Sequence, residues 1–280
     1  MSATGEGLAR DALLHITDLH FWKVTWNPLR LMGKRFLGNA NLWLRRRRQV
    51  NIDLAETTAD LLCASGVRCV VVGGDLTTTS LAEEYARAAE FLDLLAARGL
   101  RVWAIPGNHD VYTFGSARRD LFRRFLGRFM PGDALPVRVA LPGGTPLIFA
   151  PTTCPNLITS RGRVTRAEIA ETARLAADSP PGPVIVAGHY PLLFKTDAYH
   201  EQPTHRLRNA AALRDALGET GRTLLYLAGH VHRFSETTDA RHPAMTHVTS
   251  PALFYSRGGG YSEITVRDGG FQVRLRRTGP

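Results

Sequence analysis

The stretch Ile105-Pro106-Gly107-Asn108-His109-Asp110 indicates how the rest of this 280-residue chain is arranged. It ends an apolar run, 100–105, that has the length and composition of a short buried strand. Pro106 and Gly107 terminate that strand, so the three polar residues after them are expected on a turn. Ligands of open α/β sheets bind at strand ends. The stretch therefore suggests a site, although a turn of this composition is by itself equally consistent with an ordinary polar loop.

The same arrangement recurs along the chain. Apolar strands are predicted at 12–17, 67–72, 100–105, 184–187 and 223–228. The polar residues at their ends are Asp18 and His20, then Asp75, then Asn108, His109 and Asp110, then His189, and finally His230 and His232. An isolated histidine at a strand end is usually only a polar residue with a hydrogen-bond partner. The repetition at five strand ends instead predicts one shared site.

Helices are expected between these strands, which gives an α/β fold. The predicted helices are 49–65, 80–97 with Ser80 as N-cap and Glu83 as its partner, 116–130, 165–177 capped by Thr165, and 207–218. Two antiparallel segments, 137–141 and 146–150, and two further ones, 262–266 and 270–276, complete the pattern. No linker separates these elements, so we expect residues 1–280 to form a single domain.

Composition restricts the class of protein. Hydrophobic residues make up 44% of the chain and there are three cysteines, which lack the spacing of a zinc site. No apolar run reaches the length of a membrane span, and residues 1–11 lack the apolar core of a signal peptide. We therefore expect a cytoplasmic protein.

The net charge of +10 is local. Residues 19–52 contain eight Lys or Arg and no acidic residue, and residues 111–130 contain five Arg and one Asp. These segments carry +8 and +4, so the remainder is −2. The basic aromatic insertion 21–48 holds three of the four Trp, and 116–130 is predicted to be one basic amphipathic helix near the site. Such a composition suits an anionic membrane surface, and also single-stranded nucleic acid. The simpler alternative is that the aromatic residues pack in the core.

The residue types at the five strand ends define a chemistry. Imidazole, carboxylate and amide ligands suit Mn, Fe or Zn, and the absence of thiolates argues against a structural zinc site.

Five motifs in order resemble those of the calcineurin-like metallophosphoesterases. They are Asp-x-His at 18–20, Gly-Asp at 74–75, Gly-Asn-His-Asp at 107–110, Gly-His at 188–189 and Gly-His-x-His at 229–232. The resemblance implies a four-layer α/β/β/α sandwich of two mixed sheets, with a dinuclear metal site at the strand ends. It also implies a metal-dependent phosphoric ester hydrolase. A scaffold that has lost its ligands is the alternative, but all the motifs are complete.

The resemblance also implies a role for each motif residue. One metal would be held by Asp18, His20 and His232, the other by Asn108, His189 and His230, and Asp75 would bridge them. A hydroxide bridging the two metals would attack phosphorus. His109 would protonate the leaving oxygen, and Asp110 would hold the tautomer of His109.

The substrate is less well defined by the sequence. The chain looks most like the bacterial phosphodiesterase branch of the family, which predicts a phosphodiester or pyrophosphate substrate. The insertion 21–48 favours a lipid-linked or membrane-associated substrate and a peripheral position at the inner face of the membrane. Cyclic nucleotides and single-stranded nucleic acid are the alternatives. His200 and His205, in the loop after Gly188-His189, are candidate substrate contacts.

Overall fold

The structure, a computed structural model, describes residues 11–24, 49–267 and 269–278. The first of its two large sheets has the order β13-β12-β1-β2-β3. The strands are β1 (Ala12–Ile16), β2 (Cys69–Val72), β3 (Arg101–Ala104), β12 (Gly260–Arg267) and β13 (Gly270–Arg277). β1, β2 and β3 are parallel, whereas the hairpin of β12 and β13 adds antiparallel strands at one edge.

The second sheet has the order β10-β11-β9-β7-β5-β4. Its strands are β4 (Val137–Ala140), β5 (Pro146–Phe149), β7 (Val184–Ala187), β9 (Leu224–Ala228), β10 (Ser235–Thr238) and β11 (Met245–Thr249). The four inner strands are parallel and the two edge strands, β4 and β10, are antiparallel. A short parallel ladder joins β6 (Gly162–Arg163) to β8 (Leu207–Arg208). Both large sheets are therefore mixed, as predicted.

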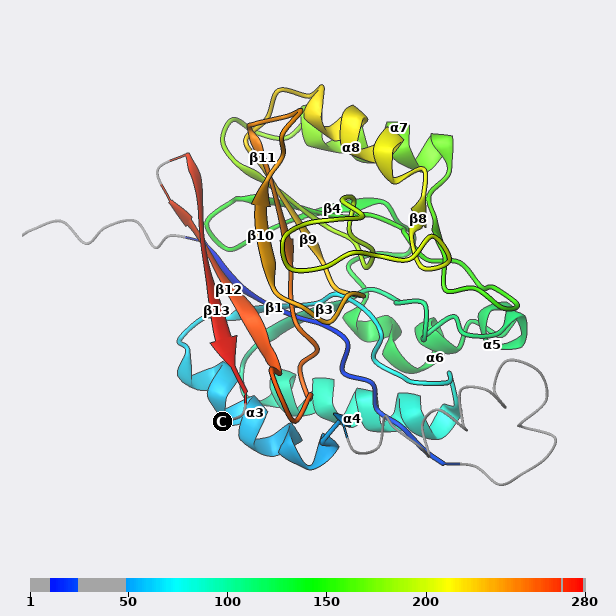
Figure 1. Cartoon of the computed structure of the whole chain (residues 1–280). Coiled ribbons are helices and arrows are strands. Elements are labelled where there is room, and N and C mark those ends of the chain that lie inside the picture. Colours follow the sequence, from blue (N-terminus) through cyan, green and yellow to red (C-terminus); the bar gives the residue numbers. More distant parts are fainter. Residues whose placement is uncertain (1–10, 25–48, 268, 279–280) are drawn as a thin grey trace, which may run out of the picture.

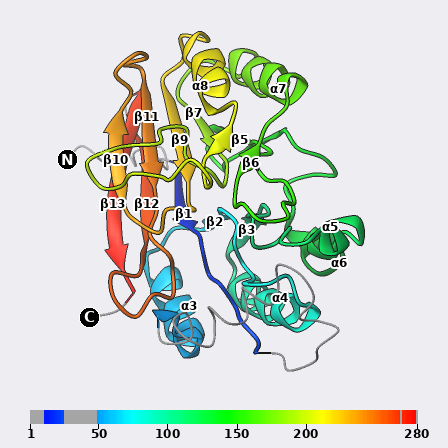
Figure 2. The ribbon, with the colours of Figure 1, turned by 45° about the vertical axis from the view of Figure 1, so that its right-hand side comes forward.

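Alternate side chains of each central strand face opposite sides of its sheet, so each sheet packs on the other sheet with one face and on helices with the other, which gives four layers. In β2, Val70 and Val72 pack toward the helices α3 (Ala55–Ala64) and α4 (Ala82–Ala97), while Cys69 and Val71 face the second sheet. The second sheet turns its other face to α7 (Arg166–Ala177) and α8 (Ala210–Gly218). Figures 1 and 2 show the two helix pairs on opposite sides of the stacked sheets. The predicted α/β/β/α sandwich is confirmed.

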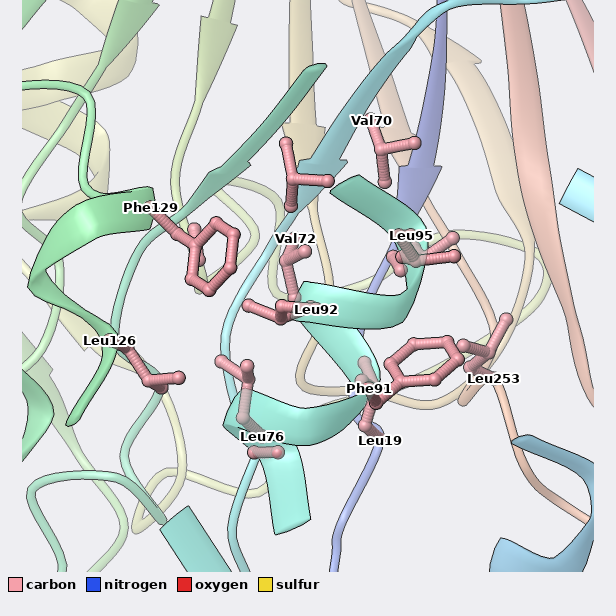
Figure 3. Packing of buried hydrophobic residues seen from close by; sticks show 14 of the residues in the cluster. Leu19, Val70, Val72, Leu76, Phe91, Leu92, Leu95, Leu126, Phe129 and Leu253 are labelled. Carbon is pink, nitrogen blue, oxygen red and sulfur yellow. The ribbon is translucent and has the colours of Figure 1, made fainter. Parts of the chain in front are cut away.

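The helical layer under the first sheet shows how the core is filled. Phe91, Leu92 and Leu95 of α4 belong to the same buried cluster as Val70 and Val72 of β2, and Leu92 lies beside Val72 in Figure 3. All five side chains are buried. Burying a side chain of this size contributes about 1.5–3 kcal/mol. This packing fixes the end of β2, from which Asp75 follows.

The predicted basic helix 116–130 is divided in the structure. It consists of α5 (Phe114–Arg118), α6 (Leu121–Leu126) and the 3₁₀ turn η3 (Gly127–Phe129). Asp120 separates the two α-helices because its φ of 44° is left-handed, which an α-helix does not tolerate. Phe122 and Phe129 are buried in the core, and Leu126 and Phe129 lie beside α4 in Figure 3. These rings are therefore not available to enter a membrane.

Two smaller predictions are also wrong. The N-cap of α4 is Leu81 rather than Ser80, because Ser80 has a φ of 55° and its hydroxyl donates to the carbonyls of His109 and Asp110. Residues 207–208 form β8 rather than helix, because they pair with β6. The predicted cap of α7 is confirmed: Thr165 accepts from the amide of Glu168.

The helix 49–65 begins later than predicted, as the 3₁₀ turn η2 (Ile52–Leu54) followed by α3. Most of the basic insertion, residues 25–48, lies outside the described residues. Within the described part of the chain, none of the helices has the length and apolar character needed to cross a membrane.

Candidate metal centre

The two sheets bring the five polar strand ends to one place. The loops after β1 and β2 are bonded together, since the amides of Asp18 and His20 donate to the carbonyls of Gly74 and Asp75, both at 2.9 Å. The loop after β9 is joined to them by the amide of His230, which donates to Asp18 Oδ2 at 2.9 Å. The site therefore spans the seam between the sheets.

The first donor group surrounds the end of β1. Asp18, His20, Asp75 and His232 each place one ligand atom within 4.8 Å of all the others. The Nε2 atoms of His20 and His232 are 3.0 Å apart, and Asp18 Oδ1 is 3.0 Å from His232 Nε2. Asp75 Oδ2 lies 4.0 Å from His20 Nε2.

The second donor group lies on the other side of Asp75. Asp75, His189 and His230 also place ligand atoms within 4.8 Å of one another. Asp75 Oδ1 is 3.4 Å from His189 Nε2. Asn108 Oδ1 is 3.1 Å from His189 Nε2 and 2.9 Å from His230 Nδ1. The two carboxylate oxygens of Asp75 thus face different donor groups.

The outer contacts of the rings determine which nitrogen faces the site. His189 Nδ1 lies 2.8 Å from the Gly73 carbonyl, and His230 Nε2 lies 3.0 Å from the His205 carbonyl. A carbonyl only accepts, so the neutral rings carry their protons there. His189 Nε2 and His230 Nδ1 then present lone pairs to Asn108 and Asp75, which also offer oxygen lone pairs. Such a set of acceptors needs a cation between them.

The electrostatics also favour a cation. Burial raises the pKa of Asp75, but the charges of His189 and His109 outweigh it and hold the pKa well below its usual range. Burial also raises the pKa of Asp18, but the charge of His232 outweighs this effect and holds the pKa well below its usual range. Burial lowers the pKa of His189, yet the Asp75 carboxylate raises it to about 9. In the metal-free protein this pKa favours a second proton on His189, at the Nε2 atom that faces Asp75, and metal binding would displace it. The donor set fits two divalent ions.

Backbone strain is concentrated at the same residues. Five non-glycine residues of the two donor groups have left-handed φ angles, between 51° and 68°: Asp18, His20, Asp75, His230 and His232. Each costs roughly 1–2 kcal/mol relative to a right-handed conformation. Strain of this kind persists where the surrounding structure enforces it, and it clusters at functional sites.

Two glycines in the motifs allow the loops to come this close. A Cβ at Gly107 would collide with the backbone and carboxylate of Asp75, and one at Gly229 would collide with Thr17 and Asp18. The Gly of Gly-Asn-His-Asp and the Gly of Gly-His-x-His are thus required by the contact between loops.

His109 lies at the edge of the site, half-buried beside His20, with the ring centroids 5.0 Å apart. Its amide donates to Asp75 Oδ1 at 2.7 Å, and its Nδ1 lies 2.6 Å from the Thr78 carbonyl. The ring of Tyr112 stacks on it at 5.2 Å. With Nδ1 directed to Thr78, Nε2 remains the atom for proton transfer.

The predicted role of Asp110 needs correction. Its oxygens accept from the amides of Leu76, Thr77 and Gly107 at 2.8–3.1 Å, and from the Thr77 hydroxyl at 2.9 Å. The carbonyl of Thr78, rather than the Asp110 carboxylate, sets the tautomer of His109. Asp110 instead ties the loop after β2 to the loop after β3, because its carboxylate is buried between them.

Two further residues at the site carried no signal in the sequence. The hydroxyl of Tyr255 lies 2.6 Å from His232 Nδ1, which leaves Nε2 of that ring to face the site. The buried Glu201 carboxylate lies 3.5 Å from His230 Nε2. Neither follows an apolar strand or belongs to a motif, so only the folded chain reveals them.

The two candidate substrate contacts lie beside His230. Exposed His200 and His205 line a hollow of about 300 Å³ together with that ring. The rings of His205 and His230 are 6.4 Å apart, whereas His200 lies against Phe194. The structure therefore brings both residues to the rim of the second donor group.

A sandwich with two carboxylate-bridged donor groups at its strand ends is the architecture of a dimetal hydrolase. A family model described as calcineurin-like phosphoesterase matches residues 12–234, and the chain belongs to this family. It is a metal-dependent phosphoester hydrolase. None of the curated proteins compared with the chain matches it.

Solved structures share the fold at low sequence identity. A dimetal phosphatase from Danio rerio has a TM-score of 0.69 and 15% identity, over 96% of each chain. Purple acid phosphatase PPD1 from yellow lupin seeds has a TM-score of 0.63 and 12% identity, over 96% of this chain and 52% of the lupin chain. GAP50, described as the anchor in the inner membrane complex of Plasmodium, has a TM-score of 0.55 and 11% identity, over 96% of this chain and 85% of its own.

Proposed function

We propose that the chain is a phosphodiesterase or pyrophosphatase that uses two divalent ions, Mn, Fe or Zn, held at the seam between the sheets. One ion is held by Asp18, His20 and His232, the other by Asn108, His189 and His230, and Asp75 bridges them. The observation that carries this proposal is the division of the Asp75 carboxylate: Oδ2 faces His20 and Oδ1 faces His189.

The chain's own residues supply the remaining chemistry. When bound, two divalent ions neutralise charge on the phosphoryl oxygens and acidify a water enough for it to attack phosphorus. His109 protonates the leaving oxygen from Nε2, since its Nδ1 is engaged by Thr78. Tyr255 and the carbonyls of Gly73 and His205 orient the ligand rings, which maintains their basicity toward a metal.

The proposal is tested with metal-loaded protein and a panel of esters. Hydrolysis of bis-p-nitrophenyl phosphate is expected, with turnover abolished in Asp75→Asn. The matched control is Asp93→Asn, because Asp93 is an exposed carboxylate paired with Arg128 on the surface. No turnover by wild type with Mn, Fe or Zn would refute the proposal. Cyclic nucleotides, single-stranded DNA and phospholipids in the same panel distinguish the substrate classes.

A lipid-linked substrate and an anionic membrane partner are the finer part of the proposal. Their support is the composition of residues 25–48, since Phe21, Trp22 and the aromatic residues of α6 and η3 pack in or against the core. Co-sedimentation with anionic and neutral vesicles tests this directly. A chain that stays in the supernatant with anionic vesicles at low salt would give cyclic nucleotides and single-stranded nucleic acid precedence over lipids.

A further inference from the structure

A large hollow adjoins the candidate metal centre on the side of His232. Its volume is about 600 Å³, and its walls include Val231, His232, Arg233, Tyr255, Arg257 and Arg277. We call it the His232 pocket. Because His232 and its neighbours form one wall, a molecule that reaches the metal centre from this side occupies the pocket with its other end.

The charge on the wall of the His232 pocket is positive. Of the described residues that line it, the charged ones besides His232 are Arg233, Arg257 and Arg277, and none is a carboxylate. All three arginines are exposed, and none forms an ion pair with a carboxylate among the residues the structure describes. On the adjacent surface, Arg276 is bound by Glu263 at 2.8 Å. The pocket therefore concentrates positive charge that the described part of the chain does not neutralise.

The wall of the pocket is fixed to the metal centre. The Tyr255 hydroxyl lies 2.6 Å from His232 Nδ1, and Val50 pairs with Tyr255 in an isolated β-bridge. Arg277 Nη1 donates to the Gly258 carbonyl at 2.6 Å, which holds this guanidinium against the same turn. The arginine side chains thus stand on a wall whose position relative to His232 is set by hydrogen bonds.

We propose that the His232 pocket binds a second phosphate group of the substrate, so that the enzyme acts on compounds with two phosphate groups, such as a nucleoside diphosphate or bisphosphate. This inference rests on the proposed function. The planar guanidinium group binds phosphate through two parallel hydrogen bonds, so a cluster of arginines without carboxylate partners is suited to a phosphate group. Tyr255 and Phe234 add aromatic surface beside them.

The test compares AMP, ADP and adenosine 3′,5′-bisphosphate on metal-loaded protein. Their affinities are measured by inhibition of bis-p-nitrophenyl phosphate hydrolysis and by calorimetry. At least one of the two-phosphate compounds should bind about tenfold more tightly than AMP, which is about 1.4 kcal/mol. That advantage should fall below twofold in the double variant Arg233→Gln/Arg257→Gln. Arg274→Gln, on an exposed residue of β13 outside the pocket, should retain it.

Two results would overturn the inference. Equal affinity of all three compounds would show that no second phosphate is recognised. An advantage that survives in the double variant would assign it to the metals rather than to the pocket. Failure of the proposed function looks different: wild type would not hydrolyse bis-p-nitrophenyl phosphate, while calorimetry would still report phosphate binding by the arginines.

Discussion

Replacing Asp110 with alanine should destabilise the fold rather than act mainly on catalysis. The Asp110 carboxylate accepts three backbone amides, from Leu76, Thr77 and Gly107. All three donors are in buried residues, and a buried donor without an acceptor costs roughly 1–3 kcal/mol. Asp110→Ala should therefore lower the free energy of unfolding by roughly 3–9 kcal/mol, a large part of the 5–15 kcal/mol typical of a whole protein.

The measurement is urea denaturation in the presence of a chelator, so that metal binding does not contribute to stability. Asp110→Asn keeps one acceptor oxygen and should lose about half as much as Asp110→Ala. Asp93→Ala is the control, since removing one partner of an exposed ion pair costs at most about 1 kcal/mol. The reasoning is refuted if the free energy of unfolding of Asp110→Ala lies within about 1 kcal/mol of wild type, as expected for the control, while its kcat falls. The Asp110 carboxylate would then act on His109.

Three further predictions concern catalysis, pH and membranes. His109→Ala should retain its metals while kcat falls by roughly 10²–10⁴, and less for a p-nitrophenolate leaving group than for an alkoxide; equal losses would exclude an acid role. Burial raises the pKa of Glu84 from 4.5 to about 7, so between these pH values the folded state holds a proton that the unfolded state has lost. The free energy of unfolding should therefore fall by roughly 3 kcal/mol as the pH rises from 4.5 through 7. Glu84→Gln should lack that decline in urea denaturation between pH 5 and pH 8, and parallel pH profiles would contradict it. Wild type should co-sediment with anionic vesicles, less so at high salt, and a Trp26/Trp43→Ser variant should bind more weakly; unchanged binding would remove these tryptophans from the contact.

Much of the fold follows from apolar runs and breakers. The central strands 69–72 and 184–187 are apolar throughout because both faces of each sheet are covered. The helix predicted at 116–130 failed because periodicity reports only which side of a segment is apolar. It does not report that Asp120 adopts a left-handed conformation. Likewise the residues that follow Leu207 have a helical pattern, but Leu207 itself forms a parallel β-ladder pair with Gly162, 45 positions earlier.

The site divides in the same way. The strand-end motifs identify Asp18, Asp75 and His109 because each follows an apolar strand directly. Tyr255 reaches His232 only through the folded chain, 23 residues after it in sequence. The left-handed φ angles of residues in the two donor groups are equally invisible in the sequence, since neighbouring loops enforce them. Long-range hydrogen bonds of this kind have no local pattern.

The dinuclear centre is tested most directly by the metal content of purified protein, measured by mass spectrometry after loading and gel filtration. Wild type should hold two divalent ions per chain. Asp75→Ala should lose at least one of them, because its two carboxylate oxygens face both donor groups. Asp93→Ala should hold two. A wild-type chain that binds a single ion, or an Asp75→Ala variant that keeps two and turns over normally, would contradict the dinuclear centre.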